Sequence, residues 1–328
     1  MTTPPLGTAA QGQSSPPPLP GRGITMLGAE QTGKSTFIGA LRIALLRHDE
    51  LGWSLSGDND GSARALIKFV NDMTEDQVFP PPTGIIEGYK WSLEAELPAT
   101  LHWERWWFRR RRRFIKIPLD LIDSPGESAD GAGEYGRESS KRLIASLSRS
   151  GGIVLFFDPV REFEKGDAFR NMHSVLTQLK AEMQYSGKLP HYVAVCITKF
   201  DDTRVYEAAR KLRVVEVDPL PPELPMVPDE YAAELFSRLS RLSKGHNADF
   251  IVPMLRQTFR EDRIKFFVTS AIGFYVDPDY GVFDPDDYQN HISREIAGGL
   301  DQIRGGIYPI NVIEPVLWLA RNVLRAAE

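Results

Sequence analysis

The sequence has little of several features that mark specialised classes of protein. It has one cysteine, Cys196, which cannot form an internal disulfide and lies in the apolar run YVAVCIT, so we expect a buried core thiol. No apolar run approaches the roughly 18 residues of a membrane span. The first residues lack the basic start and apolar run of a secretory signal. These absences predict a cytoplasmic protein.

Patterns for metal and nucleic acid are also scarce. The six histidines are scattered, without the spacing of a zinc site. The stretch DPDYGVFDPDDY, which follows Ala271, does not fit a calcium loop and is interpreted as a surface loop. A net charge of -5 argues against nucleic acid as the main partner.

What the sequence does contain is the pattern of a globular α/β protein. Residues 1–22 are rich in Pro, Ser, Gln and Gly, which predicts a disordered arm. From Gly23 onward short apolar runs alternate with helical patterns, which predicts one doubly wound domain over 23–328 with a mainly parallel sheet. We expect a helical insertion at about 202–263. The six expected strands are at about 23–27, 87–97, 114–122, 152–157, 192–198 and 264–269.

The segment LGAEQTGKST lies between the first strand and a helical pattern, and it contains a glycine, four residues and then Gly-Lys-Ser. In this context small residues let backbone N–H groups surround phosphates at a helix N-terminus. Lys34 would reach the β and γ phosphates, and Ser35 would bind Mg²⁺. A plain glycine turn is the alternative. The expected nucleotide contacts in this loop are Gly28, Glu30, Gln31, Thr32, Gly33, Lys34, Ser35 and Thr36.

A phosphate loop needs a second carboxylate near its metal, and LDLIDSPGE offers one. Asp123 follows an apolar run and is a candidate to hold Mg²⁺ through water. Gly126 can bring a backbone N–H close to a γ phosphate. The alternative is an ordinary Asp-Ser-Pro-Gly turn at a strand end.

Two further strand ends bear on the identity of the base. In ITKFD, one carboxylate of Asp201 can accept hydrogen bonds from both N1–H and the 2-amino group of guanine, and the stem of Lys199 can lie over the base. In FFVTSAIG, backbone N–H groups at Ser270 and Ala271 can reach guanine O6. Each pattern alone is typical of a solvated turn, but both follow strands whose carboxyl ends share one edge of the sheet.

Taken in order, GAEQTGKS, DSPG, TKFD and TSA resemble the motifs of P-loop GTPases of the translation-factor and Ras-like class. The resemblance covers nearly everything from Gly23 onward. It implies a six-stranded sheet with one antiparallel strand, bound GTP or GDP, and Mg²⁺. It also implies a Mg²⁺-binding threonine before the second strand, for which Thr83 in FPPPTGIIEGYKW is the candidate, with a Pro-rich turn as the alternative. Within the class, the long stretch before Thr83 and the terminal NVIEPVLWLARNV are similar to bacterial double-GTPase families.

Three residues depart from that class. Thr198 stands where asparagine is usual in the base motif, and Glu30 lies in the phosphate loop where many relatives have glycine. Glu127 follows Gly126 where hydrolytic relatives often place glutamine. A carboxylate there either polarises water or repels the γ phosphate. The candidate catalytic residues are Lys34, Thr83, Gly126 and Glu127, and the sequence supports GTP binding better than fast hydrolysis.

The block WERWWFRRRRRF, residues 103–114, places six arginines and three tryptophans in an acidic protein. It is interpreted either as a charged strand edge that resists aggregation or as a docking surface. Among partners a protein effector or regulator is favoured over nucleic acid or an anionic membrane. Three functions stay open: a GTP/GDP switch with slow or partner-stimulated hydrolysis, a non-hydrolysing nucleotide-binding scaffold, and, less favoured, an ATP-using P-loop enzyme.

Overall fold

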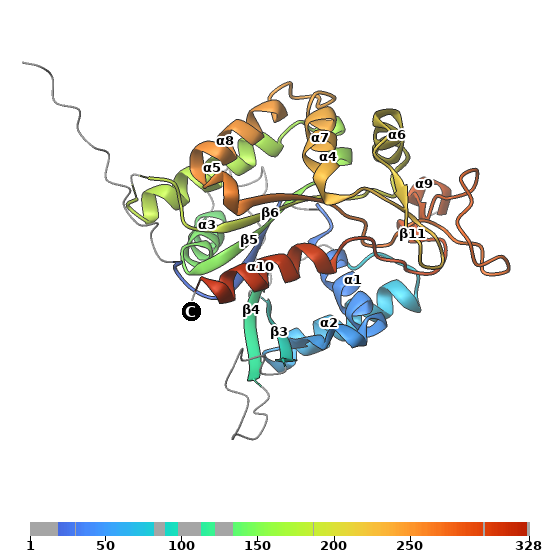
Figure 1. Cartoon of the computed structure of the whole chain (residues 1–328), viewed down its shortest axis with the longest axis horizontal. Helices are drawn as coiled ribbons and strands as arrows, with labels where there is room; N and C mark the ends of the chain where they lie inside the picture. The colour runs from blue at the N-terminus through green and yellow to red at the C-terminus, as the bar shows by residue number, and fades with distance from the viewer. Residues whose placement is uncertain are drawn as a thin grey trace, which may run out of the picture.

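The main sheet contains seven strands in a computed structural model of the chain (Figure 1). The structure describes residues 19–29, 31–81, 89–97, 113–121, 134–185, 187–297 and 299–326. The strands of this sheet are β1 (Gly23–Leu27), β2 (Trp53–Gly57), β3 (Tyr89–Leu97), β4 (Arg113–Leu121), β5 (Ser150–Phe157), β6 (Tyr192–Ile197) and β9 (Ile264–Val268).

The strand order is β2-β3-β4-β1-β5-β6-β9. Neighbours from β4 to β9 are parallel, whereas β3 is antiparallel to both β2 and β4. The expected mainly parallel α/β sheet is therefore confirmed, but the expected number of six strands was wrong. The extra strand, β2, is short, and only Trp53 and Leu55 of it are buried, so its sequence WSLSG gives a weaker apolar pattern than the other strands.

Helices cover both faces of the sheet, as Figure 1 shows for α1 and α2 on one side and α5, α7 and α8 on the other. The helices are α1 (Lys34–Arg47), α2 (Asp60–Thr74), α3 (Glu134–Leu147), α4 (Pro159–Glu164), α5 (Ala168–Glu182), α6 (Thr203–Leu212), α7 (Asp229–Ser240), α8 (Ile251–Thr258), α9 (Arg294–Ala297) and α10 (Ile313–Arg325). Short 3-10 turns lie at η1 (Asp49–Leu51), η3 (Ala248–Phe250) and η4 (Glu261–Arg263).

Two apolar cores follow from the alternation of side chains along the strands. In β5, Val154 and Phe156 belong to the core shared with α1, α2 and α10. Ile153 and Leu155, one residue out of phase, belong to the core shared with α3, α5 and α7. Cys196 is fully buried in the first core, as expected, and burial raises the pKa of its thiol. Both faces of the central strands are thus closed to solvent.

Two segments are longer than simple connections between strands. Between β6 and β9 the chain forms α6, the two-stranded pair β7 (Glu216–Val217) and β8 (Pro225–Met226), then α7 and α8. Between β9 and α10 it makes a second excursion with the pair β10 (His291–Ile292) and β11 (Gln302–Ile303).

The second excursion reaches back to the residues that follow α2. Gln302 bridges Val78, and the backbone N–H of Ile303 donates to the Gln77 carbonyl over 2.7 Å. The rings of Phe79 and His291 lie 5.5 Å apart. These contacts join parts of the chain that lie far apart in sequence.

In the part of the chain that the structure describes, none of the helices has both the length and the apolar character needed to cross a bilayer.

Candidate functional site

The loop between β1 and α1 has the backbone geometry of a tight phosphate-binding turn. Gly33, directly before α1, has a φ of 84°, which suits glycine, and Gln31 also has a positive φ of 63°. A Cβ atom on Gly28 would lie 2.8 Å from the Thr32 hydroxyl and 2.9 Å from the Cβ atom of Phe156. The glycines of the sequence pattern are therefore required by the turn and by its close packing on β5.

The side chain of Lys34 binds the backbone carbonyl groups of this loop. Lys34 is 3% exposed, and its ammonium group donates to the carbonyl oxygens of Gly28, over 2.8 Å, and Ala29, over 2.7 Å. Ser35 and Thr36 are buried beside it in the first turn of α1. Among the described residues, no side chain caps that turn, and the turn itself contains no acidic residue. A helix N-terminus of this kind, next to a buried cation, is chemically suited to an anion such as a phosphate chain.

The second part of the site lies where β6 and β9 end. Thr198 follows β6, and its hydroxyl donates to the Phe157 carbonyl over 3.3 Å. Lys199 has a φ of 59°, a conformation that turns the chain sharply before Asp201. The Asp201 Oδ1 atom accepts a hydrogen bond of 2.5 Å from the hydroxyl of Ser270, 69 residues further along the chain. The structure therefore brings the two strand-end patterns together.

The carboxylate of Asp201 is buried, which disfavours its charged form. Burial raises its pKa to about 6, although the hydrogen bond from Ser270 opposes the shift. An acid held away from water in this way, with one donor already in place, is a functional candidate because burial without a ligand destabilises its charged form. The backbone N–H of Ser270, predicted from the sequence to reach guanine O6, instead donates to the Ile310 carbonyl over 3.0 Å. Ala271, the next residue, packs partly buried against the first core.

Asp158 connects the two parts of the site, and the sequence reasoning did not identify it. Its Oδ1 atom accepts from the backbone N–H groups of Val160, over 3.0 Å, and Arg161, over 3.1 Å, and so caps α4. Its Oδ2 atom lies 2.7 Å from the ammonium of Lys199. The signal was present in FFDPVREF, because Asp followed by Pro is typical of a helix start.

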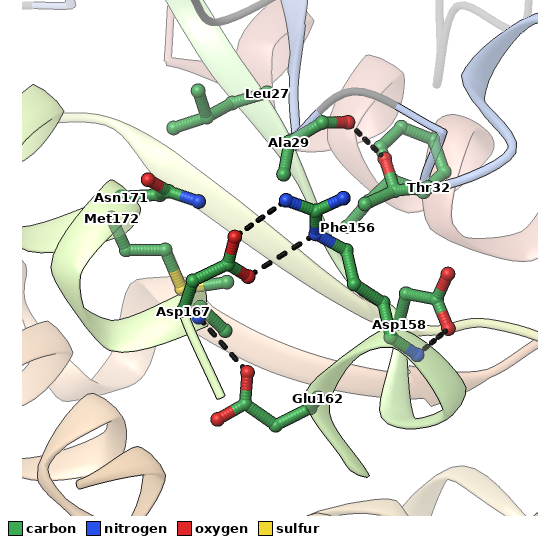
Figure 2. A pocket seen from close by; sticks show the side chains of 12 residues that line it. Leu27, Ala29, Thr32, Phe156, Asp158, Glu162, Asp167, Asn171 and Met172 are labelled. Atoms are coloured by element: carbon green, nitrogen blue, oxygen red, sulfur yellow. Dashed lines mark hydrogen bonds and ion pairs between the residues drawn. The ribbon is translucent and has the colours of Figure 1, made fainter. Parts of the chain in front are cut away.

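A pocket lies between the phosphate loop and the turn from α4 to α5, next to Ala29 and Thr32 (Figure 2). On its far side the Arg161 guanidinium binds the Asp167 carboxylate through two hydrogen bonds, of 3.1 and 2.5 Å. Glu162 accepts from the Ala168 backbone N–H over 2.9 Å, and burial raises the pKa of its carboxyl. The wall opposite the phosphate loop is therefore a fixed polar network. Little in the sequence indicates this network, because charges at these positions alone are typical of a solvated helix face.

Several expected site residues lie outside the described part of the chain. These are Glu30, Thr83, Asp123, Gly126 and Glu127. Most of the first 22 residues and residues 103–112 of the arginine block are also outside it. Among the residues that are described, no group of three or more His, Cys, Asp and Glu side chains is placed to hold a metal ion. The expected metal ligands are Ser35, Thr83 and Asp123, and of these only Ser35 lies in the described part of the chain.

No family model matches the sequence, and no curated protein matches it. Among solved structures, the chain is similar to the GTPase-like domain of S. cerevisiae Ski7, which was crystallised with GTP. The identity is 15% and the TM-score 0.39, over 94% of this chain and 50% of that one. The chain thus spans half the length of that structure, and at this score the likeness carries no functional conclusion.

Proposed function

We propose that the protein is a guanine-nucleotide-binding switch protein, which holds GTP or GDP with Mg²⁺ and hydrolyses GTP slowly or with a stimulating partner. The observation that carries the proposal is that two parts suited to a nucleotide, one for phosphate and one for the base, lie at the same edge of one sheet. Leu27, at the end of β1, pairs with Leu155, and β5, β6 and β9 continue in parallel register. The phosphate loop and the Asp201–Ser270 pair therefore follow strand ends on the same side.

The phosphate end supports binding of a charged chain. Lys34 and the uncapped N-terminus of α1 supply positive charge and N–H donors, and the Ser35 hydroxyl is suited to bind Mg²⁺. When bound, Mg²⁺ would neutralise charge that develops on the phosphates during transfer to water. Thr83 and Asp123 are the remaining proposed metal ligands, from the sequence pattern alone.

The base end supports guanine over adenine. Asp201 is already oriented by Ser270 and can accept from two neighbouring donors, N1–H and the 2-amino group, which only guanine presents. Adenine offers no such pair, so an ATP-using enzyme is the weaker alternative. Lys199, held by Asp158, is placed next to the same strand end.

The test is binding of GTP, ATP and XTP with Mg²⁺ to the full chain and to Asp201→Asn. We expect the wild type to prefer GTP, and the variant to prefer XTP because an amide can donate to the 2-oxo group of xanthine. Asp262→Asn is the matched control, since this exposed carboxylate pairs with Arg260 next to the other end of β9. Equal affinity of the wild type for ATP, or an unchanged GTP preference in Asp201→Asn, would contradict the guanine assignment.

A second function, the non-hydrolysing scaffold, is favoured by Glu30 and Glu127 in the sequence. A single-turnover measurement of phosphate release separates it from the switch. Slow release supports the switch. Tight GTP binding with no release, alone or with a candidate partner, supports the scaffold.

A further inference from the structure

The excursion between β9 and α10, residues 272–310, leaves from the loop that carries Ser270 and returns alongside it. On return, Ile310 exchanges two backbone hydrogen bonds with Ser270, of 3.0 and 2.8 Å. The Tyr308 N–H donates to the Ile272 carbonyl over 2.9 Å. The base-reading loop, residues 270–273, is therefore held by the returning chain as well as by β9.

Asn290 lies at the centre of this arrangement and is fully buried. Its Nδ2 atom donates to the carbonyls of Ile272, over 3.2 Å, and Gly306, over 3.0 Å. Its Oδ1 atom accepts from the Gly305 N–H over 2.9 Å. Both amide donors and the acceptor are used, so one side chain joins the outgoing strand of the excursion to the returning one.

A short path of hydrogen bonds runs from there to the base-reading carboxylate. The N–H of Gly273, next to Ile272, donates to the Ser270 hydroxyl over 2.8 Å, and that hydroxyl donates to Asp201. Gly273 has a φ of 70°, and a Cβ atom on it would lie 1.9 Å from the Tyr308 carbonyl oxygen. Little space is left for the loop to move unless the returning strand moves with it.

We propose that Asn290 is a positioning residue for the base-reading loop. It determines how strongly the loop prefers a base with oxygen at position 6, as in guanine, to a base with a weaker acceptor there. The proposal rests on the proposed function, since it concerns recognition of the same base. Asn290 holds Ile272 and Gly306 together, and so fixes the backbone N–H groups of Ala271 and Ile272, which would face the proposed base, and the Ser270 hydroxyl that orients Asp201.

Apolar packing already holds the excursion in place. We therefore assign the buried Asn290 amide a role in fixing the geometry of the loop and not in adding packing. The rings of Tyr206, Phe274, Phe283 and Tyr288 pack together, with centroid separations from 5.0 to 6.3 Å. An amide buried beside such a cluster costs desolvation, which its three hydrogen bonds offset, and it fixes one geometry in return.

The test uses Asn290→Asp, which has nearly the same shape but no amide donor for the Ile272 and Gly306 carbonyls. Calorimetry would give affinities for GDP, for 6-thio-GDP and for pyrophosphate. In 6-thio-GDP the donors facing Asp201 remain and O6 becomes sulfur, a weak acceptor. Asn322→Asp is the matched control, since the Asn322 amide donates to the Trp318 carbonyl within α10.

The wild type should prefer GDP to 6-thio-GDP. In Asn290→Asp the Gly306 carbonyl loses the Asn290 donor, and the Ile272 carbonyl keeps that of Tyr308 but faces a carboxylate oxygen. GDP affinity should therefore fall about tenfold or more, and the preference over 6-thio-GDP should collapse. Pyrophosphate affinity should stay at the wild-type value, which also shows that the variant is folded. An unchanged GDP to 6-thio-GDP ratio would overturn the proposal. A wild type that does not bind GDP would instead overturn the proposed function.

Asn290→Ala, judged by the same ratio, serves where the aspartate variant does not fold. Hydrogen exchange on the wild type is independent of any variant. Amides of residues 272–275 and 305–310 should gain protection with GDP but not with pyrophosphate. Equal protection by the two ligands would mean that base contact is not transmitted to Asn290, and would overturn the proposal.

Discussion

The two ends of the proposed nucleotide site are built in different ways. The phosphate end is one continuous piece, a strand, a loop and a helix that supply Gly28 to Thr36 in order. The base end is assembled from distant parts, with Asp201 after β6, Ser270 after β9 and Asn290 on the excursion. The first kind of site depends mainly on local conformation and on the packing of Gly28 against β5, whereas the second depends on the whole fold being in place.

The largest effect expected is at the phosphate end. Lys34→Ala removes a buried cation held by two loop carbonyls, so both pyrophosphate and GDP binding should weaken by about a hundredfold or more. Calorimetry with both ligands measures it, and Lys211→Ala on the exposed face of α6 is the control. Loss of GDP binding alone would place Lys34 outside the phosphate site.

This difference also explains what the sequence could predict. The phosphate loop was identifiable because its glycines, Lys34 and Ser35 are neighbours, and six strands were identifiable because each is an apolar run or alternates apolar with polar residues. The meeting of Asp201 with Ser270 was predictable once both were placed at the carboxyl ends of parallel strands. Asn290 had no local signal, since its role appears only when residues 272 and 306 are beside it.

The next effect is a pH dependence confined to the base end. Below a pKa of about 6 the buried Asp201 holds a proton and cannot accept from both guanine donors, so GDP affinity should fall about tenfold per pH unit below that value. Because this pKa is raised, the group opposes folding as pH increases through 6, and Asp201→Asn should be the more stable protein at pH 8.

The measurement is the GDP affinity of the wild type divided by that of Asp201→Asn, from pH 5 to pH 8. Titration of the phosphates cancels in this ratio. A flat ratio would show that the carboxylate is ionised throughout the range. Thermal unfolding of the two proteins at pH 8 checks the sign of the stability change.

The smallest effect is expected between the two ends. Asp158→Asn keeps a good cap for α4 but loses the ion pair with Lys199, so GDP should bind about fivefold more weakly with pyrophosphate unaffected. The effect is modest because Lys199 is 40% exposed. Asp202→Asn is the control, since Asp202 also caps a helix, α6, and pairs with Arg204. Equal loss of pyrophosphate binding would show that Asp158 acts on the phosphate loop instead.

The contact of β11 with Gln77 and Val78 has a consequence for how the chain folds. Its partners lie about 225 residues apart in the chain, so bringing them together is one of the non-local steps that slow folding. The phosphate loop precedes the excursion in the chain, so the loop is made first during synthesis. Under the proposed function, the parts that contact the base are therefore completed after the parts that contact phosphate.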